Sequence, residues 1–146
     1  MRRADVRLLP TAAGWYEEPD DVRYDALQGT VLDPGEAVLV LHTSADGRFA
    51  FAETRDYHGW VDVHALGFTD RETWRGFAAP EEFFTVTAAQ LRMEERGLLY
   101  QLGARIPGAR AADGTLRLLL PVRDAGGHLI VQERERAEDG SLTEGR

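Results

Sequence analysis

Cysteine is absent from this 146-residue sequence, and so is lysine, because all 17 basic residues are arginine. The lack of cysteine excludes disulfides, thiolate metal sites and a cysteine nucleophile within these residues. The lack of lysine excludes a Schiff-base lysine, since arginine stays protonated. A basic cluster is missing too, and the formal net charge of -8 argues against nucleic acid and anionic membranes as partners.

Long apolar runs are also missing. The run LRLLLPV at 116–122 is far shorter than a membrane span, so no membrane-spanning segment is predicted. The amino terminus carries two arginines but lacks an apolar core of the length that a signal peptide needs. Two locations therefore stay open: the cytoplasm, or the cell envelope by means of a signal outside these residues.

What is present is typical of a globular protein, with 43% hydrophobic and 29% charged residues. The length allows one ordinary domain or two very small ones. Residues 1–24 contain Pro10, Pro19 and the acidic run Glu17–Asp21, which predict an irregular arm. Arg7 could pair with an acidic residue and dock this arm. The acidic run could meet cationic groups of a ligand or simply be solvated.

Alternation and turn chemistry predict three short strands within Leu27–Val63. The first, Ala37–Thr43, has apolar residues on both faces and is expected to be buried on both. Ser44–Gly47 is a hairpin signal, with Arg48–Thr54 as the returning strand and Trp60–His64 as the third.

The second half of the chain predicts one helix and more strands. Thr69–Glu72 has the spacing of a capping box, so a short helix from about Asp70 to Gly76 is expected. Glu82–Thr87 should be a strand, whereas Ala88–Leu102 fits a helical stripe or a strand equally well. The remaining expectations are a loop at Ile106–Gly114, a hairpin of Leu116–Val122 with His128–Glu133, and a frayed tail after Ala137.

Four stretches in order resemble the first bacterial SH3 (SH3b) domain of the NlpC/P60 cysteine peptidases. They are DVRLLPT at 5–11, DALQGT at 25–30, EAVLVLHTSADGRFAFAET at 36–54 and HGWVDVHAL at 58–66. Residues 82–137, with YQLGARIP and LRLLLPVRDAGG, resemble more loosely the second SH3-like domain of that family.

The resemblance implies a mainly β chain with two tandem small SH3-like β-barrels, a short helix between strands and an irregular amino-terminal arm. The expected limits are 1–24 for the arm, 25–80 for the first SH3-like domain, 81–138 for the second and 139–146 for a polar tail. Neither barrel would bury much apolar surface alone, so mutual packing is expected.

In this family the two SH3-like domains precede a papain-like domain, a γ-D-glutamyl-diamino acid cysteine endopeptidase that cuts peptidoglycan stem peptides. The resemblance implies that the catalytic cysteine and histidine belong to that third domain. We therefore expect this chain to be no enzyme and to need no cofactor. It would target the cell wall and gate the substrate of a catalytic domain supplied in cis or in trans. The alternative is a protein-interaction module that docks or regulates a separate enzyme subunit.

The expected ligand-binding residues are Asp56, Tyr57, His58 and Trp60, at the turn before the third strand. The resemblance implies that this surface walls one side of a peptidase cleft and contacts the free amino end of the substrate. An aromatic face with a phenol suits a peptide that carries an ammonium group. The other interpretation is that Trp60 packs inside the barrel and Tyr57 only caps a turn.

Two further constellations have simpler interpretations. His58, Asp62 and His64 alternate along a strand, but a spacing of two residues separates side chains by about 7 Å, so no metal site is expected. Ser44 with His42 and Asp46 contains hydrolase residue types, yet a catalytic triad requires convergent side chains and an oxyanion hole. Turn formation explains Ser44 and Asp46, so no catalytic residue is expected.

Overall fold

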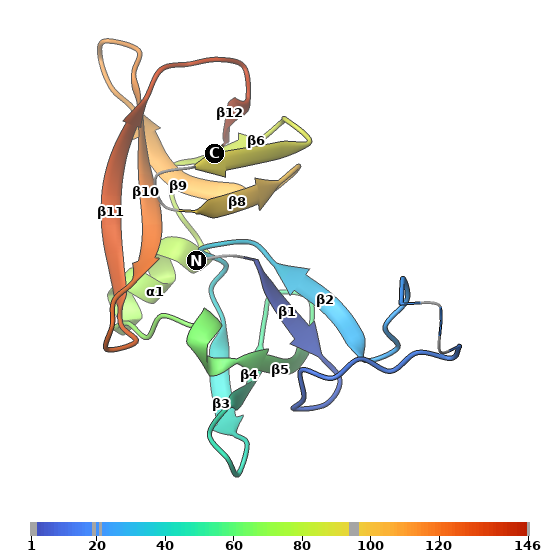
Figure 1. The fold of residues 1–146 in the computed structure, drawn as a ribbon. Helices are drawn as coiled ribbons and strands as arrows, with labels where there is room; N and C mark the ends of the chain where they lie inside the picture. Colours follow the sequence, from blue (N-terminus) through green and yellow to red (C-terminus); the bar gives the residue numbers. More distant parts are fainter. Residues whose placement is uncertain (1–2, 19, 21, 94–96, 146) are drawn as a thin grey trace. The chain divides into compact units, whose positions relative to one another are not determined.

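The computed structural model describes residues 3–18, 20, 22–93 and 97–145 (Figure 1). The chain is mainly β, with several antiparallel sheets and one short α-helix, as predicted. It divides into two compact units that interleave in sequence. The N-terminal unit is Ala4–Leu32 with Val38–Leu66, and the C-terminal unit is Asp33–Ala37 with the chain from Gly67 onward and Arg3. The domain limits expected from the sequence, 25–80 and 81–138 with an arm at 1–24 and a tail at 139–146, stay predictions.

The N-terminal unit is built on a five-stranded antiparallel sheet with the order β2-β1-β5-β4-β3. Its core is small because it depends on short side chains, with Ala50, Ala52 and Val61 fully buried beside Val6. The bounds are β1 Ala4–Arg7, β2 Gln28–Leu32, β3 Leu39–Thr43, β4 Phe49–Glu53, β5 His58–Asp62 and the 3-10 helix η1 Val63–Ala65.

Two expectations fail in this unit. Ala4–Arg7 is no irregular arm but a central strand between β2 and β5, because buried Val6 completes the core. The strand at Leu39–Thr43 is not buried on both faces, since it lies at the sheet edge and Leu39 and Leu41 are exposed. The hairpin at Ser44–Gly47 is confirmed, with the Ser44 amide donating to the Phe49 carbonyl.

The C-terminal unit combines a five-stranded sheet of order β11-β10-β9-β6-β12 with the separate pair β7-β8. Its larger apolar core includes Phe84, Ile106, Leu116 and Leu118. The bounds are α1 Arg71–Ala78, β6 Phe83–Val86, β7 Gln90–Met93, β8 Leu98–Gln101, β9 Arg105–Arg110, β10 Leu116–Arg123, β11 Leu129–Arg136 and β12 Leu142–Gly145.

The helix and the β10–β11 hairpin are confirmed, with one change at the helix start. Asp70, not Thr69, is the N-cap, and its carboxylate accepts a hydrogen bond from the Thr73 amide at 2.8 Å. The ambiguous segment Ala88–Leu102 forms the strands β7 and β8. Residues 94–96 of that segment lie outside the described residues.

Two segments of the C-terminal unit are ordered where the sequence predicts none. The expected loop at Ile106–Gly114 begins as β9, because Ile106 is fully buried and Gly108 allows close approach to the Arg117 carbonyl of β10. The expected frayed tail contains β12, which pairs with β6 because Leu142 fills the core.

Candidate functional site

Five aromatic rings form a continuous strip on the sheet of the N-terminal unit. They belong to His42 on β3, Phe51 on β4, His58 and Trp60 on β5, and Tyr57 immediately before β5. Ring centroids of contacting pairs lie 5.1 Å to 6.1 Å apart along the strip. His42 stacks on Phe51 with an interplanar angle of 18°, and Trp60 makes T-shaped contacts with both rings. We call these five residues the aromatic strip.

Strand register explains why these rings meet. His42 lies directly opposite Phe51, and Phe51 lies directly opposite Trp60, so the three side chains share one face of the sheet. Alternation along the strands sends Ala52 and Val61 to the other face, where the core lies. The Ser44–Gly47 turn sets His42 opposite Phe51, and a β-bulge at Leu41 then leaves Leu41 without a partner and pairs Val40 with Ala52.

The turn before β5 positions one end of the aromatic strip. The Thr54 hydroxyl donates to the Tyr57 carbonyl at 2.8 Å and accepts from the Tyr57 amide at 3.0 Å, which closes the turn. The Tyr57 ring then lies over Gly29 of β2, where an added Cβ would come within 2.7 Å of it. Asp56 is exposed at the tip of this turn.

The four predicted ligand-binding residues thus lie together at one end of β5. His58 and Trp60 belong to the aromatic strip, Tyr57 ends it and also packs, partly buried, against the apolar core, and Asp56 is exposed beside it. The ring of Trp60 is half-buried by the neighbouring rings and is not part of the apolar core of this unit. Glu53 lies opposite His58, so a carboxylate accompanies the rings at this end.

A buried ion pair borders the strip on its β1 side. Arg7 is only 7% exposed and lies opposite Trp60 in the β1–β5 ladder. Its guanidinium donates to the Asp25 carboxylate at 2.8 Å, to the Ala13 carbonyl at 2.7 Å and to the Gln28 side chain at 3.2 Å. The expected pairing of Arg7 with an acidic residue is therefore confirmed.

Asp25 is the centre of this network. Its carboxylate accepts from the backbone amides of Trp15 and Leu27, at 2.9 Å and 3.0 Å, besides the bond from Arg7. The bond from the Trp15 amide, then that from Leu27, and also the Arg7 cation hold the pKa of Asp25 below its ordinary value. Asp25 therefore stays ionised and ties the loop between β1 and β2 to Arg7.

The two other residue sets considered from the sequence, the histidines with Asp62 and the Ser-His-Asp set, do not bring their side chains together. Asp62 caps η1 by accepting from the His64 amide, while His58 lies at the other end of β5. Within the described part of the chain, no group of three or more histidine, aspartate or glutamate side chains could hold a metal ion. The Ser44 hydroxyl donates to Asp46 at 2.6 Å within the hairpin turn, and His42 stacks on Phe51 instead.

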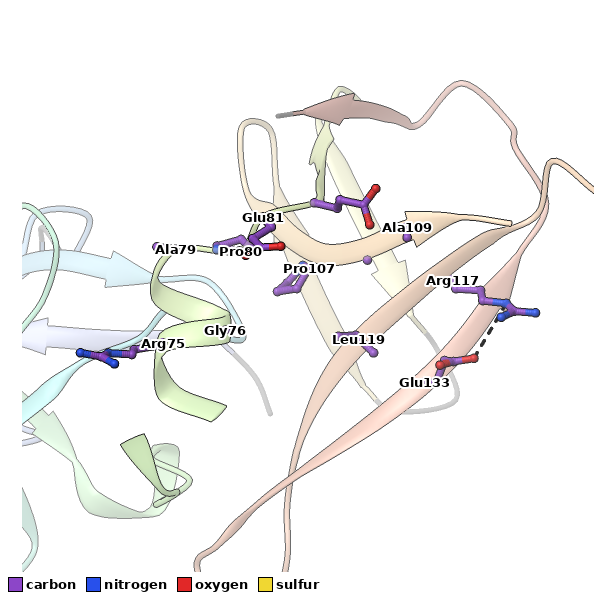
Figure 2. Close-up of a pocket in the computed structure, with 12 residues that line it drawn as sticks. Arg75, Gly76, Ala79, Pro80, Glu81, Pro107, Ala109, Arg117, Leu119 and Glu133 are labelled. Atoms are coloured by element: carbon purple, nitrogen blue, oxygen red, sulfur yellow. Dashed lines mark ion pairs between the residues drawn. The ribbon is translucent and has the colours of Figure 1, made fainter. Parts of the chain in front are cut away.

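The C-terminal unit contains an open hollow of about 610 Å³ beside α1. Figure 2 shows Pro107 and Leu119 lining it, with Arg117 and Glu133 paired on β10 and β11. The Arg117–Glu133 distance is 4.0 Å, and Arg117 also lies 3.5 Å from Glu135, so this cation is already neutralised. Arg75, Glu81 and Glu82 also line the hollow.

The acidic run Glu17–Asp21 of the predicted arm lies in the loop between β1 and β2. Glu17, Glu18 and Asp20 are exposed, whereas residues 19 and 21 lie outside the described residues. No helix among the described residues is long and apolar enough to span a membrane.

His42 and Phe51 are the site residues that sequence reasoning missed. The sequence pattern offered His42 only in a Ser-His-Asp set, which was rejected, and Phe51 only within the returning strand Arg48–Thr54. Counting the register outward from the Ser44–Gly47 turn brings His42 opposite Phe51, and counting outward from the Thr54–Tyr57 turn brings Phe51 opposite Trp60. The residue pattern does not show the bulge at Leu41, which determines how Leu39 and Val40, not His42, pair with β4.

Comparison with known proteins agrees with this geometry. A family model described as an SH3 domain of the SH3b1 type matches residues 14–62, most of the N-terminal unit. No curated protein matches the chain. A solved structure of an NlpC/P60 endopeptidase from Photobacterium damselae subsp. piscicida matches with a TM-score of 0.72 and 19% identity.

That match covers 97% of this chain and 32% of the endopeptidase chain, so this chain spans about a third of the protein whose fold it shares. With no cysteine at any position, this chain carries no cysteine nucleophile. Residues 14–62 thus match a bacterial SH3 domain model, and the fold of the whole chain is that of a part of an NlpC/P60 endopeptidase.

Proposed function

We propose that this chain is a non-catalytic module that binds peptidoglycan stem peptides and presents them to a hydrolase of the NlpC/P60 type. The observation that carries the proposal is the aromatic strip, which ends in the Asp56–Tyr57 turn on a unit that matches an SH3b1-type domain. Such a strip offers apolar ring faces beside a phenol, two imidazoles and two carboxylates, which suits a short peptide with an ammonium group.

The roles of the residues follow from their positions. Trp60 and Phe51 supply flat apolar surface for the ligand backbone and the alanyl methyl group. Tyr57 offers a ring face and a hydroxyl to the amino end, and exposed Asp56 supplies the opposite charge. The contacts are few, so a dissociation constant near a millimolar is expected, about -4 kcal/mol of binding free energy.

An NMR titration with murein tripeptide tests this proposal. Saturable shifts should appear at the amides of Tyr57–Trp60, and Trp60→Ala should weaken binding about fivefold or more. Leu41→Ala is the matched control, because Leu41 is an exposed apolar residue on β3 outside the strip. An absence of shifts at Tyr57–Trp60 at several times millimolar ligand would reject the proposal.

A second candidate function is docking to a separate enzyme subunit, such as an NlpC/P60 catalytic domain supplied in trans. The observation that favours it is β11, an edge strand of the C-terminal sheet on which Ile130 and Val131 are exposed. An exposed edge strand can pair with a strand of another chain. Co-elution with such a domain, abolished by Val131→Pro but not by Trp60→Ala, would support docking over peptide binding.

A further inference from the structure

The hollow beside α1 lies on the outer face of the C-terminal sheet, away from the core. Ile106 on β9 and Leu118 on β10 are fully buried in the core. Because side chains alternate along a strand, their neighbours Pro107 and Leu119 point to the opposite face. Figure 2 shows these two residues lining the hollow beside α1. The hollow, of about 610 Å³, is thus a part of the outer face that α1 leaves open.

The floor of the hollow is apolar and its backbone is held in place. Five small or apolar residues from α1, β9, β10 and the turn before β6 supply this floor: Ala79, Pro80, Pro107, Ala109 and Leu119. The Gly108 amide donates to the Glu82 carbonyl at 3.1 Å, which ties the turn before β6 to β9. A ligand that enters therefore loses little free energy to ordering of the site.

Two carboxylates on one side of the floor are available to a ligand. Glu81 and Glu82 line the hollow and are exposed. Within the part of the chain that the structure describes, neither carboxylate takes part in an ion pair. Their charges are therefore not neutralised by a neighbouring arginine.

The other side of the floor is also negative. Arg117 lies 4.0 Å from Glu133 and 3.5 Å from Glu135, so one cation faces two carboxylates. Arg75 lines the hollow too, but Figure 2 shows its guanidinium directed away from the apolar floor. Negative charge on both sides of an apolar floor is complementary to a ligand that combines apolar and cationic groups.

The openness of the hollow favours a polypeptide segment over a small molecule. A small cation lying on an open floor leaves much of its surface in water, so it gains little from burial. A segment can place an apolar side chain on the floor and continue along the sheet. Val131, two residues from Glu133 on β11, is exposed on the same face and extends the apolar surface.

We propose that the hollow beside α1 is a docking site for a segment of a partner protein in which apolar residues are flanked by arginine or lysine. The apolar side chains lie on Pro107 and Leu119. One flanking cation lies at Glu81 and Glu82, and the other lies at Glu133. This site is in the C-terminal unit and does not depend on the aromatic strip.

Two synthetic peptides test the proposal by NMR titration of the full chain: acetyl-Arg-Leu-Val-Arg-amide and its acidic counterpart acetyl-Glu-Leu-Val-Glu-amide. The basic peptide should give saturable shifts at the amides of Glu82, Ala109 and Leu119. It should bind about tenfold more tightly than the acidic peptide at low salt. Added salt should reduce this difference, because screening weakens charge attraction.

A matched pair of variants locates the binding in the hollow. Glu81→Gln/Glu82→Gln should reduce the affinity for the basic peptide about threefold or more, because one of its cations loses its partners. Glu17→Gln/Glu18→Gln is the control, since it removes the same charge from exposed positions of the N-terminal unit. This control should leave the affinity within about 1.5-fold of wild type, because distant exposed charges are screened.

Three results would overturn the proposal. The first is an absence of shifts at Glu82, Ala109 and Leu119 at several times millimolar basic peptide. The second is equal affinity for the two peptides. The third is an equal loss of affinity in the two glutamate variants, because a diffuse attraction to the net charge of -8 would then explain the binding. None of these results bears on the aromatic strip, whose test is measured at Tyr57–Trp60.

Discussion

Arg7 shows how one buried cation shapes the surface around it. Its guanidinium is enclosed by three acceptors from residues 13, 25 and 28, which belong to the loop that follows it and to the start of β2. A buried charge is tolerated only when it is paired, so the loop must return to Arg7 to supply these acceptors. The positions of Ala13, Asp25 and Gln28 around the guanidinium thus follow from where Arg7 lies.

Replacing Arg7 should therefore loosen the whole loop. Arg7→Met keeps apolar volume but leaves Asp25 and the Ala13 carbonyl without their donor, and the free energy of unfolding should fall by about 2 kcal/mol. Chemical denaturation measures this loss, and amide exchange should show faster opening at Trp15 and Leu27. Unchanged exchange at these two amides would contradict the role of Arg7.

The Asp25 carboxylate should make the loop acid-sensitive. Its pKa is held below the ordinary value in the folded state, first by the Trp15 amide. The stability it contributes is therefore present above the unfolded pKa and is lost as the pH falls through the folded pKa, below about pH 4. The difference in melting temperature between wild type and Asp25→Asn should shrink from pH 6 to pH 2. A constant difference would contradict this assignment.

Gly29 tests how the Tyr57 ring is held. Its backbone does not need glycine for conformational reasons, but an added Cβ would lie 2.7 Å from the ring of Tyr57. Gly29→Ala should therefore displace the ring and weaken peptide binding about threefold, with little loss of stability because Gly29 is exposed. Gly76→Ala is the control, since nothing lies within 4 Å of its added Cβ.

At the scale of elements, β12 forms one edge of the five-stranded C-terminal sheet. Leu142 is 5% exposed and packs with the core residues of this unit, while Thr143–Gly145 continue the ladder with β6. A turn centred on Asp139 precedes the strand, and bonds from the Ser141 side chain and amide and from Arg136 lower the pKa of Asp139 to about 2. The turn therefore stays charged and hydrogen-bonded at neutral pH.

Truncating Leu142 tests whether β12 contributes to stability. Leu142→Ala should lower the free energy of unfolding by about 2 to 4 kcal/mol, since it opens a cavity in a packed core. Denaturant unfolding measures the change, and Leu102→Ala is the control because Leu102 is an exposed leucine of the same unit. A loss no larger than that of the control would mean that the strand is dispensable.

Local residue patterns predicted the elements with strong turn signals and missed those that depend on distant partners. The Ser44–Gly47 hairpin and the helix after Asp70 follow from turn and capping residues alone. β9 could not be predicted, since its Pro107 and Gly108 are typical of loops, and its strand state depends on β6 and β10. β12 likewise exists only because β6 offers an open edge and the core accepts Leu142.

The candidate site was predictable to the same extent. Asp56–Trp60 was found from a turn and from family resemblance, both local in sequence. Phe51 and His42 join the aromatic strip through strand register, which requires the pairings across two successive turns. Arg7 pairs with Asp25, which lies 18 residues later in the sequence. The residue pattern could therefore indicate that Arg7 has an acidic partner, but not which residue it is.

At the scale of the whole molecule, the C-terminal unit includes a short segment from within the N-terminal half of the chain. Residues 33–37 lie between β2 and β3 in sequence but belong to the C-terminal unit. The Asp33 carboxylate accepts from the Gln101 amide at 3.2 Å and from the Arg3 side chain at 3.1 Å, and Gly35 lies against Phe77. The C-terminal unit is therefore incomplete without the earlier segment.

A fragment starting at Gly67 should consequently be less stable than the same unit in the full chain. Its melting temperature should fall by several degrees, because the Gln101 amide and the apolar contacts of Gly35 lose their partners. Circular dichroism on the fragment and on the full chain measures this directly. A fragment as stable as the intact unit would contradict the assignment of residues 33–37.

The most direct test of the aromatic strip as a peptide-binding surface is an isotope-filtered NOE experiment on the full chain with murein tripeptide. The account predicts cross-peaks from the alanyl methyl group of the peptide to the rings of Tyr57 and Trp60, lost in Trp60→Ala. Saturable binding whose cross-peaks all fall elsewhere, for instance at Leu119 in the hollow beside α1, would contradict it.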